Sequence, residues 1–432
     1  MSLAPRSYTE FTSRLHDRLG RRRVPIDVSI EVTRRCPLEC AHCYNNLPMA
    51  DPVARREELT LAEHVRILDE LADAGTMWLL YTGGEIFARA DFLDIYRHAK
   101  TKGLIVTLFT NGTLVTERIA DVLAEWRPFS VEVTLYGRTR ETYERLTGIP
   151  GSYDRCLAGV RRLVDRGLSV SLKTVAVTLN RHEVEDMKRF ARDELGLEFK
   201  FDAMMTPRLD CGKSPLEVRL RPEEIVELDL LDEDRVREWA EQAATFIRPQ
   251  HLPGHENDVY HCGGGNNGLS IDPYGGMTIC NFSMRDVYDL KRGTVAEGWG
   301  RFLRDVRARQ ITRVTKCTAC QLKSLCGMCP ANAELETGDA ETPVDFLCEV
   351  AHLRALALGW RVPEHGTCEY CPGGPRHAAM AGAAARLGER VAAIRAGARR
   401  PVRVALPVLA APSGAGCGSG CGSCGTRDEA RW

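Results

Sequence analysis

Three cysteines near the start of the chain have the spacing of an iron–sulfur site. Cys36, Cys40 and Cys43 lie four and three residues apart, directly after a β-rich run at residues 28–32. A four-iron cluster is normally held by four cysteines, so three thiolates on one loop leave one iron open to a substrate or cofactor. A zinc site, or three unrelated thiols, is the alternative interpretation.

Short polar motifs end the next three apolar runs. Gly83, Gly84 and Glu85 follow the second run, a Thr-Asn-Gly motif at residues 110–112 ends the third, and residues 134–137 end the fourth. Paired glycines allow a ligand to approach the backbone closely, and Glu85 offers an acceptor for a ligand ammonium group. One such motif alone is typical of a plain turn, but a series at successive run ends indicates a binding site.

A second group of cysteines lies in the C-terminal half, where periodicity is lost and Gly, Asn and Cys dominate. Its members are Cys262, Cys280, Cys317, Cys320, Cys326, Cys329 and Cys348. A stretch expected to form so little apolar core needs cross-links for stability, and metal sites provide these cross-links where thiols stay reduced. One or two structural zinc sites are an alternative, although seven cysteines exceed the four ligands of one tetrahedral zinc.

The remaining cysteines have several open interpretations. Cys368 and Cys371 form a further CxxC pair, which is a redox pair, an extra ligand pair or an exposed pair in a loop. A Gly/Ser-rich tail repeats the first spacing and is a disordered thiol tail, a metal-binding or cluster-loading segment, or a substrate-like segment; it carries Cys417, Cys421 and Cys424. Cys156 and Cys211 stand alone and are expected to be inert.

Alternating strands and helices are expected to position the first group. Apolar runs predict buried parallel strands at residues 28–32, 77–81, 104–109, 131–135, 169–177 and 197–201. Helical patterns lie between them; one begins with a capping box at Thr60 and Glu63 and ends at Gly75. Six β/α units predict a barrel or a doubly wound sheet, with functional groups at the carboxyl ends of the strands.

These motifs resemble those of the radical S-adenosylmethionine (radical SAM) enzymes. Cys36, Cys40 and Cys43 match the family's CxxxCxxC motif, residues 83–85 match its GGE motif, and the resemblance covers residues 26–204. It implies an α/β fold with a partial (β/α)6 TIM-like barrel, and a [4Fe–4S] cluster whose open iron chelates the amine and carboxylate of S-adenosylmethionine. It further implies that electron transfer cleaves the sulfonium to a 5′-deoxyadenosyl radical, which abstracts hydrogen from a substrate.

The same resemblance assigns roles around the cluster. Glu85 binds the methionyl ammonium, Thr134 binds the ribose hydroxyls, and Arg155 binds the methionyl carboxylate or is a solvated helix charge. Three positions depart from the family pattern: Ile86 replaces a proline, His42 replaces an aromatic residue, and Tyr136 stands where many relatives carry aspartate.

The second cysteine group resembles the SPASM domain, a small cysteine-rich module with two auxiliary [4Fe–4S] clusters. The resemblance implies that Cys317, Cys320, Cys326 and Cys348 hold the second auxiliary cluster. It assigns Cys262, Cys280 and Cys329 to the first, with no upstream cysteine to complete the set. The usual CX3C is one residue short at Cys326 and Cys329. An open iron or a non-cysteine ligand is therefore expected in the first auxiliary cluster.

Composition bounds the class of protein. The chain has 432 residues, 17 cysteines and a formal net charge of 58 − 59 = −1, so no nucleic-acid or membrane partner is indicated. No apolar run approaches the roughly 18 residues that a membrane span needs, and no apolar signal segment follows the N-terminal arginines. A cytoplasmic location is expected, where 17 cysteines point to metal or redox chemistry rather than disulfides.

The expected organisation has six parts. These are an N-terminal basic extension (1–25), the barrel (26–206), a bridging segment (207–261), the SPASM domain (262–372), an Ala/Arg-rich helix-like segment (373–412) and the Gly/Ser/Cys tail (413–432).

The resemblances imply a radical SAM oxidoreductase that oxidatively modifies a peptide or protein side chain. Oxidation or decarboxylation of a small cofactor or tetrapyrrole precursor is the alternative, and a non-catalytic iron–sulfur or zinc scaffold is an alternative of another class. An electron donor such as flavodoxin or ferredoxin is implied, and a peptide substrate would need a separate leader-peptide-binding protein. The substrate and the bond formed are not indicated.

Overall fold

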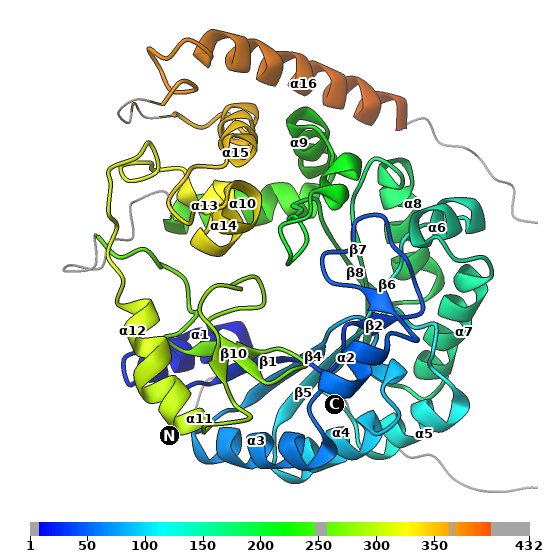
Figure 1. Ribbon diagram of the computed structural model, residues 1–432. Coiled ribbons are helices and arrows are strands. Elements are labelled where there is room, and N and C mark those ends of the chain that lie inside the picture. The colour runs from blue at the N-terminus through cyan, green and yellow to red at the C-terminus, as the bar shows by residue number, and fades with distance from the viewer. Residues whose placement is uncertain (1–7, 247–256, 363, 365–367, 399–432) are drawn as a thin grey trace, which may run out of the picture.

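Six parallel strands form one side of a nine-stranded sheet, from β1 to the edge strand β8 (Figure 1). The structure is a computed structural model, and it describes residues 8–246, 257–362, 364 and 368–398. The six strands are neighbours in chain order: β1 (Asp27–Glu31), β4 (Trp78–Thr82), β5 (Ile105–Thr110), β6 (Ser130–Thr134), β7 (Val170–Val175) and β8 (Glu198–Asp202). Each lies where an apolar run predicts it, and the expected α/β class with a partial barrel is confirmed.

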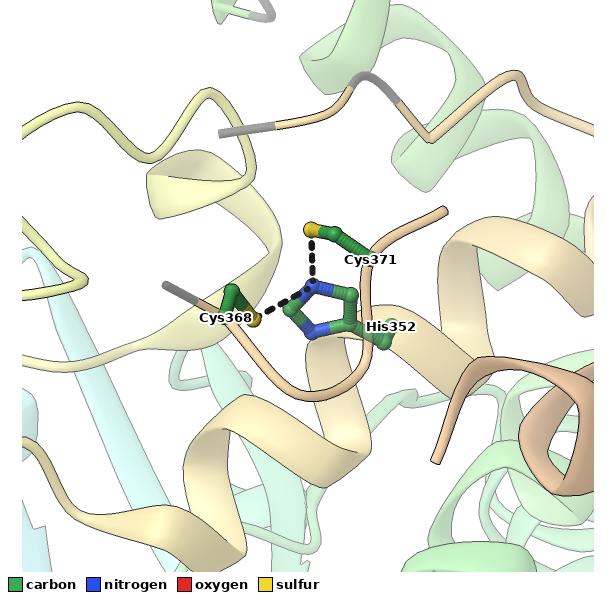
Figure 2. Close-up of side chains that lie close together, drawn as sticks. All are labelled: His352, Cys368 and Cys371. Atoms are coloured by element: carbon green, nitrogen blue, oxygen red, sulfur yellow. Dashed lines mark hydrogen bonds between the residues drawn. The ribbon is translucent and has the colours of Figure 1, made fainter. Parts of the chain in front are cut away.

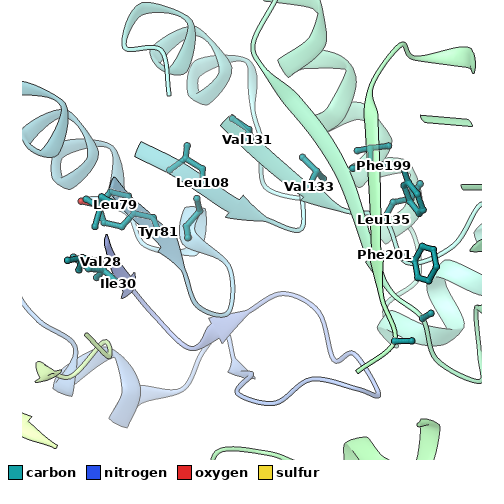
Figure 3. Packing of buried hydrophobic residues seen from close by; sticks show 14 of the residues in the cluster. Val28, Ile30, Leu79, Tyr81, Leu108, Val131, Val133, Leu135, Phe199 and Phe201 are labelled. Carbon is teal, nitrogen blue, oxygen red and sulfur yellow. The ribbon is translucent and has the colours of Figure 1, made fainter. Parts of the chain in front are cut away.

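One face of these strands is apolar and lies under a layer of helices (Figure 1). The side chains of this core are fully or almost fully buried (Figure 3) and include Val28, Ile30, Leu79, Tyr81, Leu108, Val131 and Val133. The covering helices are α3 (Leu61–Asp73), α4 (Phe92–Thr101), α5 (Glu117–Glu125), α6 (Arg140–Thr147), α7 (Ser152–Asp165) and α8 (Val184–Arg189). The apolar alternation of the strands therefore sets which face the helices cover.

Helix α3 begins and ends at the residues that its sequence predicts. The Thr60 hydroxyl accepts a hydrogen bond from the Glu63 backbone N–H at 3.2 Å, and the Glu63 carboxylate accepts one from the Thr60 N–H at 2.7 Å. This reciprocal pair is the capping box. Gly75 follows the helix with a φ of +95°, a conformation that glycine adopts without steric cost.

The opposite face of the strands carries polar side chains. Lys173 on β7 donates to the Glu132 carboxylate on β6 at 3.2 Å, and it stands beside Thr134 in the register of the two strands. Burial lowers the pKa of Lys173 to about 8, and the neighbouring Glu132 carboxylate partly opposes that shift. The barrel therefore presents ionisable groups on the face that the helices leave uncovered.

Three further strands extend the sheet on the other side of β1. Strand β9 (Gly268–Ile271) pairs parallel with β1, and β10 (Gly276–Thr278) and β11 (Tyr288–Asp289) continue antiparallel from it. These strands come from the segment expected to form a separate cysteine-rich domain. The sheet therefore crosses the expected boundary at residue 262, and β1 is a central strand rather than an edge.

A second group of helices comes from the C-terminal half (Figure 1). It comprises α9 (Pro222–Leu231), α10 (Glu233–Phe246), α13 (Lys323–Cys326), α14 (Pro330–Thr337), α15 (Asp345–Ala357) and α16 (His377–Ala398). Helix α16 packs on α15 and α9. Arg354 of α15 is buried, with its guanidinium 2.8 Å from the Asp229 carboxylate and 3.9 Å from the centre of the Trp239 ring.

Shorter elements join the two groups. They are α1 (Tyr8–Gly20), β2 (Arg35–Cys36), β3 (Leu47–Pro48), α2 (Pro52–Glu57), α11 (Val295–Glu297) and α12 (Leu303–Arg307). The expected basic extension thus contains a helix, α1, and the Ala/Arg-rich segment contains α16. The tail at 413–432 lies outside the described residues. In the described part of the chain, no helix combines the length and apolar character that crossing a bilayer requires.

Candidate functional site

The first cysteine group lies on the loop that follows β1. The thiols of Cys36, Cys40 and Cys43 are close enough to affect one another's ionisation. The Asn111 side-chain amide donates to Cys36 Sγ at 3.4 Å, so the end of β5 contacts the same loop. The structure therefore brings the three expected ligands together at the carboxyl ends of the parallel strands.

Burial makes these thiols poor acids in the absence of a cation. Desolvation raises the pKa of Cys36 to about 12, and it raises the pKa of Cys40 and Cys43 as well. Nearby thiolate and carboxylate charges raise the pKa of Cys36 and Cys40 further. Three thiolates crowded in one place call for a compensating positive charge, which a bound metal centre provides. The donor set therefore fits an iron–sulfur cluster.

Buried ion pairs and hydrogen bonds hold the loop in place. Arg35 makes a two-pronged pair with Glu58, with two N–O distances of 2.9 Å. Arg208, from the segment after β8, donates to the Cys43 carbonyl at 3.2 Å and to the Asn46 side chain at 3.1 Å. Sequence reasoning missed these supports because an isolated arginine or glutamate carries no spacing pattern that links it to a distant loop.

The two glycines of the GGE motif pack against the cysteine loop itself. Gly83 has a φ of +132°, and a Cβ built on it would lie 2.2 Å from the Thr33 carbonyl oxygen. A Cβ on Gly84 would lie 2.5 Å from the Arg34 carbonyl oxygen and 2.6 Å from that of Arg35. The sequence predicts that a ligand approaches these glycines closely. On the side where a Cβ atom would lie, the group that comes close is the Thr33–Arg35 backbone. The glycines thus hold β4 against the loop that carries Cys36.

Glu85 is fully buried at the end of β4 and is held from three sides. Its carboxylate accepts hydrogen bonds from the Thr110 hydroxyl at 2.8 Å, the Asn111 backbone N–H at 2.8 Å and the Phe87 backbone N–H at 3.2 Å. Desolvation raises its pKa to about 7, and these hydrogen bonds oppose that rise. Thr110 and Asn111 belong to the Thr-Asn-Gly motif, so two of the polar motifs meet at one carboxylate.

The other expected contacts are less closely joined to this centre. Thr134 ends β6 and is half-buried, whereas Arg155 is exposed in the first turn of α7. Tyr136 is partly buried, and its ring centre lies 5.1 Å from that of His42. Burial and the three nearby thiols raise the pKa of the Tyr136 hydroxyl. His42 and Tyr136, two of the departures from the family pattern, therefore pack on each other beside the cysteine loop.

Four cysteines of the second group come together around α13 and α15. Cys317, Cys320, Cys326 and Cys348 influence one another's ionisation. The hydrogen bond between Cys317 and Cys348 lowers the pKa of the Cys317 thiol to about 7 and raises that of Cys348, so the pair shares one proton. Desolvation raises the pKa of Cys326 to about 12.

The three cysteines expected at the first auxiliary cluster also lie near one another. Cys262 and Cys329 both raise the pKa of Cys280, for which burial is the largest cause. A cavity of about 570 Å³ separates the two cysteine sets and is lined by thiols from both, including Cys262, Cys329 and Cys348. His261 lines the same cavity. The two expected ligand sets are thus neighbours across one cavity.

Cys368 and Cys371 are buried rather than exposed in a loop. They flank His352 of α15, a residue that the sequence pattern did not single out. The only available signal was its position one helical turn after Cys348, which places both residues on the same helix face.

Comparisons with known proteins support the assignment of the barrel. Residues 30–193 match the Radical SAM superfamily. The chain is 25% identical over 332 residues to an AdoMet-dependent heme synthase of Methanosarcina barkeri, covering 72% of this chain and 93% of the synthase. It is 25% identical over 343 residues to a PqqA peptide cyclase of Xanthomonas axonopodis pv. citri, covering 77% of this chain and 89% of the cyclase.

The fold likeness extends into the cysteine-rich half. The crystal structure of Streptococcus suis SuiB bound to S-adenosylmethionine superimposes with a TM-score of 0.57 at 15% identity, covering 81% of this chain and 82% of SuiB. SuiB bound to its precursor peptide SuiA superimposes over the same shares, with a TM-score of 0.54 and 16% identity. Together with the cysteine loop, the GGE motif and the partial barrel, these matches show that residues 30–193 form a radical SAM domain and that the chain shares the fold of SuiB.

Proposed function

We propose that this protein is a radical SAM oxidoreductase that modifies a peptide or protein side chain. The observation that carries the proposal is the cysteine loop beside Glu85. Three thiols and one buried carboxylate meet at the carboxyl ends of the barrel strands, where this class of fold binds its ligands. In this proposal Cys36, Cys40 and Cys43 hold a [4Fe–4S] cluster.

The chain's own residues bind and orient S-adenosylmethionine. The Glu85 carboxylate accepts the methionyl ammonium, because an ionised acceptor held by backbone N–H groups is already oriented. Gly83 and Gly84 keep the strand end against the cysteine loop. Thr134, at the end of β6, is the residue assigned to the ribose hydroxyls in this proposal. Arg155 is exposed, so its role as the carboxylate partner has the weakest structural support. Cys36, Cys40 and Cys43 would hold the cluster and Glu85 would hold S-adenosylmethionine; given one electron from a reducing partner, this pair would supply a carbon-centred radical for hydrogen abstraction.

Two auxiliary [4Fe–4S] clusters complete the proposal. Cys317, Cys320, Cys326 and Cys348 form one ligand set, and Cys262, Cys280 and Cys329 form the other; their grouping around one cavity supports both sets. Such clusters supply an acceptor for the electron that remains when a substrate radical is oxidised. His261 lines the same cavity and is a candidate fourth ligand for the incomplete set.

The peptide substrate class is supported by relatives along most of the chain. A PqqA peptide cyclase and a SuiB structure with a bound precursor peptide both cover more than three quarters of this chain. The proposal includes a reducing partner such as flavodoxin or ferredoxin, and a separate leader-peptide-binding protein. It also places the enzyme in the cytoplasm, where thiols are kept reduced.

A tetrapyrrole or other small cofactor precursor is the second candidate substrate. The heme synthase relative supports it, since the likeness covers 93% of that protein. The peptide and the tetrapyrrole would undergo the same radical step, and they differ in which molecule binds as the substrate. An iron porphyrin would change its visible absorption on binding, whereas a peptide would not produce that change.

Cleavage of S-adenosylmethionine is the first test. Anaerobically reconstituted protein with a chemical reductant is expected to form 5′-deoxyadenosine, Cys40→Ala is expected to form none, and Cys211→Ser serves as a control at an exposed cysteine. Equal product from the wild type and Cys40→Ala would remove the proposal.

Substrate class is tested separately. Deuterium at the reacting carbon of a peptide encoded beside this gene is expected to appear in 5′-deoxyadenosine. Transfer from a labelled porphyrin precursor instead would favour the second candidate.

A further inference from the structure

A histidine and two cysteines converge on one point beneath α15. His352 Nε2 lies 3.3 Å from Cys371 Sγ and 3.5 Å from Cys368 Sγ, and all three residues are buried (Figure 2). The two cysteines come from the CxxC turn at residues 368–371, which follows the second cysteine group in the chain. This trio belongs to neither of the expected cluster ligand sets.

The spacing of the trio suits a single metal ion. The three ligand atoms all lie within 4.8 Å of one another. No other trio of His, Cys, Asp or Glu residues in the described part of the chain meets this limit, and the three thiols of the cysteine loop do not meet it either. Zinc binds sulfur at about 2.3 Å and nitrogen at about 2.0 Å, so tetrahedral geometry separates a nitrogen and a sulfur ligand by about 3.5 Å. The two N–S distances of 3.3 and 3.5 Å agree with that value.

The other ring nitrogen of His352 is already engaged. Nδ1 lies 2.7 Å from the carbonyl oxygen of Cys348, one turn earlier on α15. A carbonyl only accepts, so the proton belongs on Nδ1 and Nε2 presents its lone pair toward the two sulfurs. Metal-binding histidines nearly always have this arrangement, in which a hydrogen bond on one nitrogen orients the other.

The CxxC turn is held in a fixed shape before any metal binds. Gly374 donates its backbone N–H to the Cys371 carbonyl at 2.8 Å, and a Cβ on Gly374 would lie 2.5 Å from the Glu369 carbonyl oxygen. The Glu369 side chain accepts from Lys316 Nζ at 3.0 Å, which ties the turn to the residue before Cys317. The Tyr370 ring lies 5.4 Å from the His352 ring. A ligand set fixed in this way loses little conformational entropy on binding.

We propose that His352, Cys368 and Cys371 bind one Zn²⁺ ion at a site separate from the iron–sulfur clusters. Each thiol releases its proton to solvent on binding, and the two thiolates balance the charge of the ion, so a buried site carries no net charge. His352 and Cys368 also line the 570 Å³ cavity, from which water reaches the fourth coordination position. The ion fastens the CxxC turn, and through it α16, to α15 beside Cys348.

Metal content of the full-length protein tests the site. Protein purified anaerobically with its clusters intact is analysed for zinc and iron per chain, in the wild type, Cys371→Ser, His352→Gln and the exposed-cysteine control Cys211→Ser. The wild type and the control are expected to contain one more zinc per chain than the other two variants. In those two variants, occupancy of this site by zinc should fall at least tenfold. Iron is expected to stay the same in all four.

Zinc X-ray absorption and a rescue variant complete the test. The wild-type spectrum is expected to contain sulfur at about 2.3 Å and nitrogen at about 2.0 Å. His352→Cys is expected to keep the zinc that His352→Gln loses, which separates lost coordination from misfolding. Equal zinc in all variants, a loss of iron in place of zinc, or a Cys368–Cys371 disulfide in the purified wild type would each overturn the site. None of these outcomes depends on cleavage of S-adenosylmethionine, so the site and the proposed function can fail independently.

Discussion

The barrel and the cysteine-rich half share one apolar core but differ in what joins their segments. In the barrel, parallel strand ladders and buried residues such as Leu108 and Val131 position the loops that carry chemistry. In the cysteine-rich half, strands are short, and thiols, the Arg354–Asp229 pair and the CxxC turn connect the segments. In the barrel, the strands and their apolar side chains hold the functional residues in place. In the second half, the cysteines that could bind metal also help to connect the segments.

Removal of all metal should produce the largest difference in stability between the barrel and the cysteine-rich half. Anaerobic chelation is expected to abolish protection from hydrogen exchange around residues 317–348 while leaving β4 to β7 protected, because none of the expected metal ligands lies on those four strands. Hydrogen exchange with mass spectrometry measures both regions in one sample. Equal loss of protection in the two regions would show that the barrel depends on metal as much as the cysteine-rich half does.

Loss of the buried arginine is the next largest expected effect. Arg354→Ala leaves Asp229, itself almost fully buried, with Arg235 at 2.7 Å as its one ion-pair partner among the described residues. We expect a loss of about 3–5 kcal/mol in the free energy of unfolding, since one charge of a buried pair is left undercompensated. The barrel's exposed Arg140–Asp154 pair is the matched control, and Arg140→Ala should have a much smaller effect on the free energy of unfolding, because both charges are solvated. Denaturant titration compares the two variants.

A cavity in the barrel core should cost somewhat less. Leu108→Ala removes a fully buried side chain between β5 and its covering helices, and it is expected to cost about 2–5 kcal/mol. Its effect should appear in the unfolding of β4 to β7 and leave the metal content unchanged. Loss of iron from this variant at a temperature where it remains folded would contradict the separation of scaffold from chemistry. Leu61→Ala, at a partly exposed position, is the control.

The smallest predicted effect concerns pH. Because burial raises the pKa of Glu85 to about 7, the carboxyl must lose a proton to pair with the methionyl ammonium at lower pH. Affinity for S-adenosylmethionine is therefore expected to fall by up to about tenfold per unit as pH drops from 7 to 5.5, and to level off just above 7. Glu85→Gln should bind more weakly, without this pH dependence. A flat profile for the wild type would exclude Glu85 as the titrating partner.

The barrel was predictable because its periodicity is long and regular. Each of the six parallel strands has an apolar run flanked by turn residues, and the Thr60 cap and the Gly75 stop are local signals. Strands β9 to β11 escaped prediction because they span four residues or fewer in a glycine-rich segment, and pairing with β1 is a tertiary effect. Short strands gain their stability from partners that sequence spacing does not reveal.

The site was predictable in its ligand types and less so in its supports. Spacing identified the cysteine groups and Glu85, and the structure brings their members together. The role of Gly83 and Gly84 beside a ligand stays a prediction; the sequence did not reveal that their Cβ positions face the Thr33–Arg35 backbone, because the motif does not show which group lies against it. The CxxC turn was expected to be exposed in one interpretation and is buried, because His352 and α16 cover it from segments that share no local pattern with it.

The pairing of β1 with β9 has a consequence for how the protein is made. The two strands begin 268 − 27 = 241 residues apart, so at about 5–20 residues per second the ribosome needs about 12–48 s to supply the second after the first. During that interval one edge of β1 stays unpaired and is open to association with other chains. Chaperone demand should therefore be greatest during this interval, and nascent chains stalled before residue 268 are where it can be measured.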